Sequence, residues 1–139
     1  METRDFLNHT EENTPGIRKI KALYKALHEK DEASIQKLLV DEPIWNVSPG
    51  FPYGGVYSGM SGVFGDFYAK LRKRYKKFGA VPETFIDGGD VITVLGFYKF
   101  EKPGETALES VRFAHTWKFD MAGRIKGVWQ VADSAIFAI

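Results

Sequence analysis

The chain has 139 residues, of which 44% are hydrophobic and 14% aromatic, and its formal net charge at pH 7 is +1. This length suits one domain with a real hydrophobic core, and the balanced charge gives no reason to expect nucleic acid or an anionic membrane surface as a partner. Because the chain contains no cysteine, disulfides, thiolate metal sites and a cysteine nucleophile are excluded.

Residues 1–14 are polar and acidic and carry little apolar periodicity. We therefore expect a flexible N-terminal arm over residues 1–14, followed by a single domain over residues 15–139. The arm contains no apolar run of signal-peptide length, and no later stretch is apolar enough to cross a bilayer. These features predict a cytoplasmic protein without membrane contact.

Two helices are predicted after the arm. From Pro15 onward, apolar residues recur at intervals of three and four, which is the pattern of an amphipathic helix; they are Ile17, Ile20, Tyr24 and Leu27. Asp31 is a suitable N-cap for a second, short helix that we expect to run through Val40 and to be ended by Pro43.

A short strand is predicted at residues 44–48, and the Gly- and Pro-rich residues 49–59 are expected to be loop. From Ser61 the helical period returns with a strongly apolar face, formed by Phe64, Phe67, Tyr68, Leu71, Tyr75 and Phe78, and Gly79 fits the position just after the helix. Basic residues between Lys70 and Lys77 occupy the other face, which we interpret as a solvated surface.

After Pro82 the pattern changes to strands, at residues 83–86, 91–100, 108–119 and 124–133, joined by short turn-like links. Helices therefore come first and an antiparallel meander follows. This order predicts an α+β domain in which three N-terminal helices cover one face of a curved antiparallel sheet.

The order of these elements resembles the SnoaL-like branch of the nuclear transport factor 2-like superfamily. Residues 52–59 (PYGGVYSG) resemble the loop before its long helix, residues 113–117 (FAHTW) its penultimate strand, and residues 123–125 (GRI) with 131–133 (VAD) its last hairpin and strand end. The resemblance covers residues 17–133 and implies a cone-shaped α+β domain around an apolar pocket. The superfamily includes polyketide cyclases, steroid isomerases and epoxide hydrolases, and also many binding domains with no catalysis.

His115 and Asp133 are the candidate catalytic residues. His115 stands in a row of large apolar side chains on an alternating strand, and burying an imidazole costs free energy unless a partner or a ligand satisfies its nitrogens. Asp133 ends a similar row on the last strand, formed by Ile125, Gly127, Trp129 and Val131. A histidine and an aspartate that meet in an apolar cavity could remove a proton next to a carbonyl group.

The resemblance implies the same pair, because SnoaL-like cyclases are associated with a general acid/base aspartate near the last strand and with a pocket histidine. The alternatives stay open: His115 could be a satisfied core or interface residue, and an offset between the two strands could keep it from Asp133. The candidate ligand-binding residues are Tyr24, Trp45, Asn46, Tyr53, Tyr57, Phe64, Trp117 and Trp129, and each of them could also be plain core.

Two branches of the superfamily fit less well. Residues 44–48 contain no acid, whereas the steroid isomerase branch has a carboxylate base on its first strand. The epoxide hydrolase branch uses two aspartates and an arginine, and Arg112 lies on the opposite strand face from His115. The three histidines have no metal-ligand spacing, so we expect no metal and no other cofactor.

Two functions follow from this sequence. The first is a cofactor-free acid/base enzyme, a cyclase or isomerase that acts on a small, carbonyl-bearing hydrophobic molecule. The second is a non-catalytic module for ligand binding or dimerisation. Under either function we expect a homodimer, because a sheet whose two faces both tolerate apolar residues usually has both of them covered.

Overall fold

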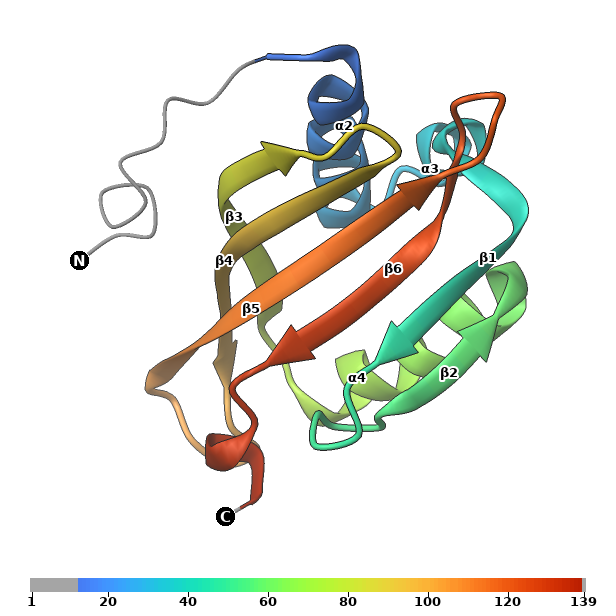
Figure 1. Cartoon of the computed structure of the whole chain (residues 1–139). Helices are drawn as coiled ribbons and strands as arrows, with labels where there is room; N and C mark the ends of the chain where they lie inside the picture. The colour runs from blue at the N-terminus through green and yellow to red at the C-terminus, as the bar shows by residue number, and fades with distance from the viewer. Residues whose placement is uncertain (1–12, 139) are drawn as a thin grey trace.

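The computed structural model describes residues 13–138. In this part of the chain, three helical segments lie against one face of a curled, open sheet of six strands, behind the sheet in the view of Figure 1. The α+β architecture predicted from the sequence is therefore confirmed. The predicted arm, residues 1–14, lies outside the described residues except for its last two. Within the described part, no helix has the length and apolar character needed to span a membrane.

Helix α2 (Pro15–Glu29) begins where its signals predict. Thr14 is its N-cap and accepts a hydrogen bond from the backbone N–H of Ile17 at 3.2 Å, and Pro15 occupies the first turn, where its missing N–H costs nothing. The helix ends at Lys30, which adopts a left-handed conformation with φ 56°. Its buried side chains include Ile17, Ile20, Leu23, Tyr24 and Ala26, which turn one face toward the sheet.

Helix α3 (Glu32–Leu38) is capped by Asp31 as predicted, but it ends two residues before Val40. Strand β1 (Leu39–Val47) starts at once and contains Pro43, so the prediction that Pro43 ends the helix is wrong. Pro43 lies between the two stretches of β1 that pair with strand β6 (Ile125–Ala132), where its missing N–H interrupts no ladder.

The segment expected to be loop contains a short edge strand. Strand β2 (Gly55–Ser58) pairs antiparallel with β1, from Ile44 opposite Ser58 to Val47 opposite Gly55. Its four residues are too few to show a clear alternation beside so many Gly and Pro residues. This strand forms because β1 offers an open edge for pairing, and no local pattern in the sequence predicts it.

The third helical segment is shorter and wider than predicted. It begins at Ser61 as a π-helix, η1 (Ser61–Tyr68), and continues as helix α4 (Ala69–Arg74). Tyr75 is already extended, and strand β3 (Phe78–Asp87) follows, so the predicted continuation of the helix to Phe78 is wrong. Phe78 pairs with Phe100 of the next strand, and this sheet pairing overrides the local helical period.

Strands β3, β4 (Val91–Glu101), β5 (Leu108–Phe119) and β6 form the antiparallel meander that the sequence predicts. The strand order across the sheet is β2-β1-β6-β5-β4-β3, and β1 runs parallel to β6. The sheet is therefore mixed instead of wholly antiparallel. A short 3-10 helix, η2 (Ala135–Ala138), follows β6 near the C-terminus (Figure 1).

A bulge at the start of β6 decides which of its residues face the core. Phe119 pairs with Ile125 but Lys118 pairs with Gly127, so Lys126 is skipped in the ladder. A Cβ atom on Gly127 would lie 2.1 Å from the carbonyl oxygen of Ile44, so only glycine lets β1 and β6 approach this closely.

After this bulge, Val128 and Gln130 face inward and are buried, at 6% and 3% exposed. Trp129 and Val131 face outward and are 63% and 44% exposed. The predicted inner row of Ile125, Gly127, Trp129 and Val131 is therefore wrong beyond the bulge. A one-residue slip reverses the face of every side chain that follows it.

Candidate functional site

A cavity of about 160 Å³ lies between the inner face of the sheet and the helices. Its wall is rich in aromatic side chains, from Tyr24, Trp45, Phe51, Phe67, Tyr68, Phe78, Tyr98 and Trp117. A cavity of about this size holds one benzene-sized ring. Its polar wall groups include His115 and Gln130, from the inner faces of β5 and β6.

His115 is held between two tyrosine hydroxyls. Its Nδ1 lies 2.6 Å from the Oη of Tyr24 on α2, and its Nε2 lies 2.6 Å from the Oη of Tyr98 on β4. The side chain is 6% exposed, and this burial lowers the pKa of His115 to about 3. The imidazole is therefore neutral at pH 7, with one N–H and one bare nitrogen.

Each tyrosine hydroxyl also accepts a hydrogen bond from a neighbour. The indole N–H of Trp117 donates to the Oη of Tyr24, and the Nε2 of Gln130 donates to the Oη of Tyr98, both at 3.0 Å. Burial raises the pKa of both tyrosines well above the usual value, so both hydroxyls keep their hydrogens. We call these five residues, Trp117, Tyr24, His115, Tyr98 and Gln130, the Tyr–His–Tyr network.

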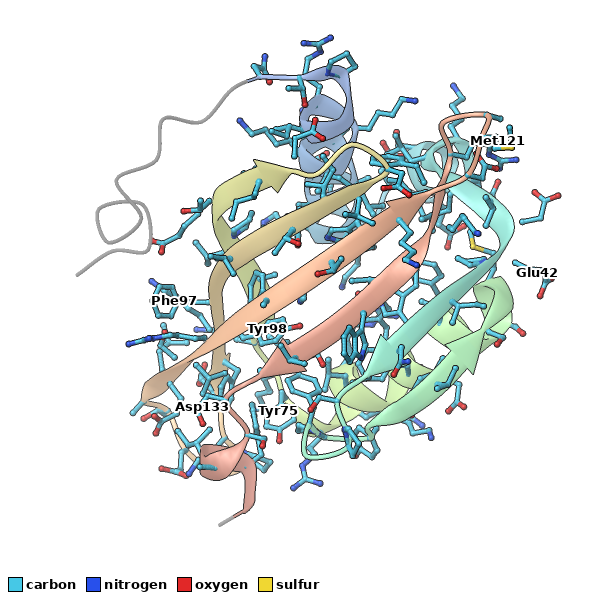
Figure 2. The ribbon with its side chains drawn as sticks, in the orientation of Figure 1. Glu42, Tyr75, Phe97, Tyr98, Met121 and Asp133 are labelled. Atoms are coloured by element: carbon cyan, nitrogen blue, oxygen red, sulfur yellow. The ribbon has the colours of Figure 1, made fainter. Side chains whose placement is uncertain are left out.

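The Tyr–His–Tyr network is assembled from distant parts of the chain. Tyr24 comes from α2, the first helix described, and Tyr98, labelled in Figure 2, comes from β4, the strand next to the edge strand β3. His115 is opposite Val94 of β4 and Gln130 of β6 in the strand ladders. The alternation of β4 and β5 turns Tyr98, His115 and Trp117 to the same side of the sheet.

A larger, more open groove of about 430 Å³ adjoins the cavity. Four side chains line both spaces and form the border between them, namely Leu27, Lys30, Tyr68 and Arg72. Tyr68 accepts a hydrogen bond from the indole N–H of Trp45 at 3.0 Å, and burial raises the pKa of Tyr68 to about 12.

The structure places half of the predicted ligand-binding residues at these two spaces. Tyr24, Trp45 and Trp117 line the cavity together with His115, and Phe64 lines the adjoining groove. The other half lie elsewhere: Tyr53 and Tyr57 are half-buried beside the core, and Asn46 and Trp129 are exposed. The Oη of Tyr57 donates a hydrogen bond to the carbonyl oxygen of Tyr53 at 2.5 Å, so the Tyr57 hydroxyl already has a partner within the protein.

The structure does not bring Asp133 to His115. Asp133 is exposed and follows the end of β6, close to the C-terminus (Figure 2). Its carboxylate accepts a hydrogen bond from the backbone N–H of Ala135 at 3.3 Å, which caps the short helix η2. The bulge at Gly127 reverses the faces of the residues that follow it, and Asp133 lies beside Arg112, away from the position opposite His115, which Gln130 occupies. No carboxylate of the described residues lines the cavity.

Sequence reasoning missed Tyr98, Gln130 and Tyr68 as site residues. The alternation of β4 could have found Tyr98, which shares a face with Val94 and Phe100. The glycine inside the last strand is the signal of a bulge that could have found Gln130. For metal ligands, residues 13–138 contain no group of three or more His, Cys, Asp or Glu side chains that could hold an ion.

Comparison with solved structures gives matches across nearly the whole chain. An NTF2-like protein of unknown function from Burkholderia pseudomallei is 22% identical, with a TM-score of 0.78 over 89% of this chain and 95% of its own. TerC, co-crystallised with polyporic acid, is 22% identical, with a TM-score of 0.79 over 90% and 96%. A protein from Shewanella denitrificans, provisionally described as a SnoaL-like polyketide cyclase, is 18% identical, with a TM-score of 0.73 over 90% and 96%.

These similarities confirm the fold that the sequence resemblance implies. The sequence itself matches no protein-family model and none of the curated proteins.

Proposed function

We propose that this chain, which has the NTF2-like fold, binds a small, carbonyl-bearing hydrophobic molecule in the cavity beside His115. The observation that carries this proposal is the Tyr–His–Tyr network at a cavity whose wall is rich in aromatic side chains. Burying polar groups costs free energy, and an apolar core of the same shape is often at least as stable. Convergent polar groups at an apolar cavity are typical of ligand recognition.

The size of the cavity and the neighbouring structures support the same class of ligand. A space of about 160 Å³ suits a single ring with a small substituent, and the adjoining groove gives room for a longer one. TerC, a structural neighbour, was co-crystallised with polyporic acid, which makes this compound a second one to test after simple aromatic ketones.

Acid/base catalysis by a cyclase or isomerase is the second candidate function. It is favoured by the hydroxyl groups in the cavity wall, because such donors stabilise the negative oxygen that forms when a ketone loses an α-proton. The reaction would also need a base. Burial lowers the pKa of His115 to about 3, which makes it a weak one, and Asp133 lies outside the cavity. Binding without turnover is therefore the better supported of the two functions.

Titration with acetophenone in D₂O, followed by NMR, tests both functions. We expect shifts at the cavity residues on binding, and we expect affinity to fall at least about tenfold in Val128→Phe, because the new ring would occupy the space. Asp133→Asn is the matched control and should bind like the wild type. Exchange of the ketone's methyl hydrogens for deuterium, faster than without protein, would instead support catalysis.

Two results would contradict the proposed binding site. If acetophenone binds equally well to Val128→Phe, the ligand sits elsewhere on the protein. If neither acetophenone nor polyporic acid binds to the wild type, the cavity is a packing void and not a binding site for this class of ligand.

We also propose that a second copy of the chain covers the outer face of β1 and β6. Ile44, Trp129 and Val131 are 49%, 63% and 44% exposed there and come from the two neighbouring strands. Apolar side chains gathered on a sheet face favour association. Sedimentation of the wild type should show a dimer, and Trp129→Glu should shift it to a monomer. Met121→Glu, on the turn labelled in Figure 2, is the control and should leave the dimer intact.

A further inference from the structure

The Tyr–His–Tyr network holds one more hydrogen than it can use internally. Tyr24, Tyr98 and neutral His115 each contribute one O–H or N–H hydrogen. Only two contacts join them, from Tyr24 to Nδ1 and from Tyr98 to Nε2. Each contact uses one hydrogen, so one of the three is left over. It has to belong to a tyrosine, because the imidazole N–H faces a tyrosine oxygen in either tautomer.

The two ends of the network cannot accept the extra hydrogen. Trp117 is a donor only, because its indole nitrogen has no free lone pair. The Oε1 of Gln130 accepts the backbone N–H of Ser48 at 3.1 Å, which orients the amide so that its NH₂ group faces Tyr98. Within residues 13–138, neither tyrosine hydroxyl has a further hydrogen-bond partner.

Both tyrosines that could carry the extra hydrogen line the cavity. Tyr24 is 9% exposed and Tyr98 is 8% exposed, so bulk water does not readily satisfy either hydroxyl. A buried donor without an acceptor costs free energy that a suitable ligand atom restores. Because both side chains line the cavity, a ligand bound there could supply that acceptor.

We propose that this extra hydroxyl hydrogen points into the cavity and donates a hydrogen bond to the ligand, so that the site favours a bare acceptor oxygen, such as a ketone carbonyl. The inference rests on the proposed function, because it assumes that the cavity binds a ligand. It adds the polarity of the contact: the protein donates and the ligand accepts. A hydrocarbon of the same shape leaves the donor unpaired.

The tautomer of His115 decides which tyrosine donates. If Nδ1 carries the hydrogen, Tyr24 accepts it and its own hydroxyl is free for the ligand. If Nε2 carries the hydrogen, Tyr98 accepts it and becomes the donor to the ligand. The ring nitrogen that is protonated in the complex therefore identifies the tyrosine that donates to the ligand oxygen.

A pair of isosteric ligands tests this inference. Acetophenone carries a carbonyl oxygen where α-methylstyrene carries a CH₂ group, and their dissociation constants are measured by NMR for the wild type, Tyr24→Phe and Tyr98→Phe. The readout is the ratio of the two constants in each protein, because comparing ratios cancels the different solubilities of the ligands. The ¹⁵N shifts of His115 in the acetophenone complex identify the tautomer.

We expect the preference for acetophenone to fall about tenfold when the donating tyrosine becomes phenylalanine, and to change less than about twofold in the other variant. In the wild type, one tyrosine hydroxyl resonance should move downfield with acetophenone and not with α-methylstyrene, which tests the inference without any substitution. The affected tyrosine should be Tyr24 if Nδ1 of His115 carries the hydrogen, and Tyr98 if Nε2 carries it.

Three results would overturn the inference. If both ligands bind and the ratio is the same in all three proteins, the hydroxyls do not contact the ligand, although the proposed function survives. If the preference for acetophenone falls instead in the variant that lacks the tyrosine donating to His115, the hydrogen count is wrong. If neither ligand binds, the proposed function fails and this inference fails with it.

Discussion

The free energy of unfolding should fall by about 2.5 kcal/mol between pH 7 and pH 4.5 because of His115 alone. Burial lowers the pKa of His115 from 6.5 to about 3 in the folded protein. Between these two values the unfolded chain binds a proton at His115 and the folded protein does not, so acid favours unfolding. Well above pH 6.5 the residue is neutral in both states, and its contribution no longer changes with pH.

Urea unfolding at a series of pH values would measure this effect in the wild type, His115→Gln and His28→Gln. The carboxyl groups titrate in all three proteins and cancel in the comparison. His115→Gln should lose the histidine-dependent part of the slope, whereas His28→Gln should keep it, because His28 is exposed at the end of α2. Equal slopes in the wild type and His115→Gln would mean that His115 titrates normally, and that the network is open to water.

Trp117→Ala should lower the free energy of unfolding by about 3–5 kcal/mol, as truncation of a fully buried aromatic side chain does. Trp117 is 2% exposed, and its ring lies edge-on against Trp45 and Tyr24, with centroids 5.4 Å and 5.8 Å away. The substitution removes these contacts and also the hydrogen bond from the indole to Tyr24. Chemical denaturation of the purified variant measures the loss.

Trp129→Ala is the matched control for this change. Trp129 pairs with Thr116, next to Trp117 in sequence, but it lies on the outer face of the sheet and is 63% exposed. At low protein concentration we expect its truncation to cost less than about 1 kcal/mol. A loss that grows with protein concentration would support the dimer proposed for this face. Similar losses from both substitutions in dilute solution would contradict the assignment of the two faces.

Much of the fold could be predicted because the local patterns are strong. The alternation of residues 108–119 predicts β5 with its bounds, and the spacing after Pro15 predicts α2 with its cap. Predictions are wrong where partners override a local pattern. Tyr75 and Phe78 continue the period of a helix, but the chain turns extended because β4 offers a pairing edge.

The candidate site could be predicted in part. His115, Tyr24 and Trp117 stand in apolar rows, and such rows predict a buried face even when the packing partner of the helix or strand is unknown. Counting alternate residues along β6 predicts that Asp133 joins them, but the bulge at Gly127 breaks that count. A count along one strand holds only while every residue has a partner in the ladder.

By itself, the sequence determined the side-chain faces of α2 and β5, because side-chain direction in a regular element follows its local backbone period. The tertiary structure alone decided the parallel pairing of β1 with β6, the bulge that turns Gln130 inward, and the meeting of Tyr24, Tyr98 and His115. These features depend on contacts between segments far apart in the chain, and contacts of this kind leave no period in the sequence.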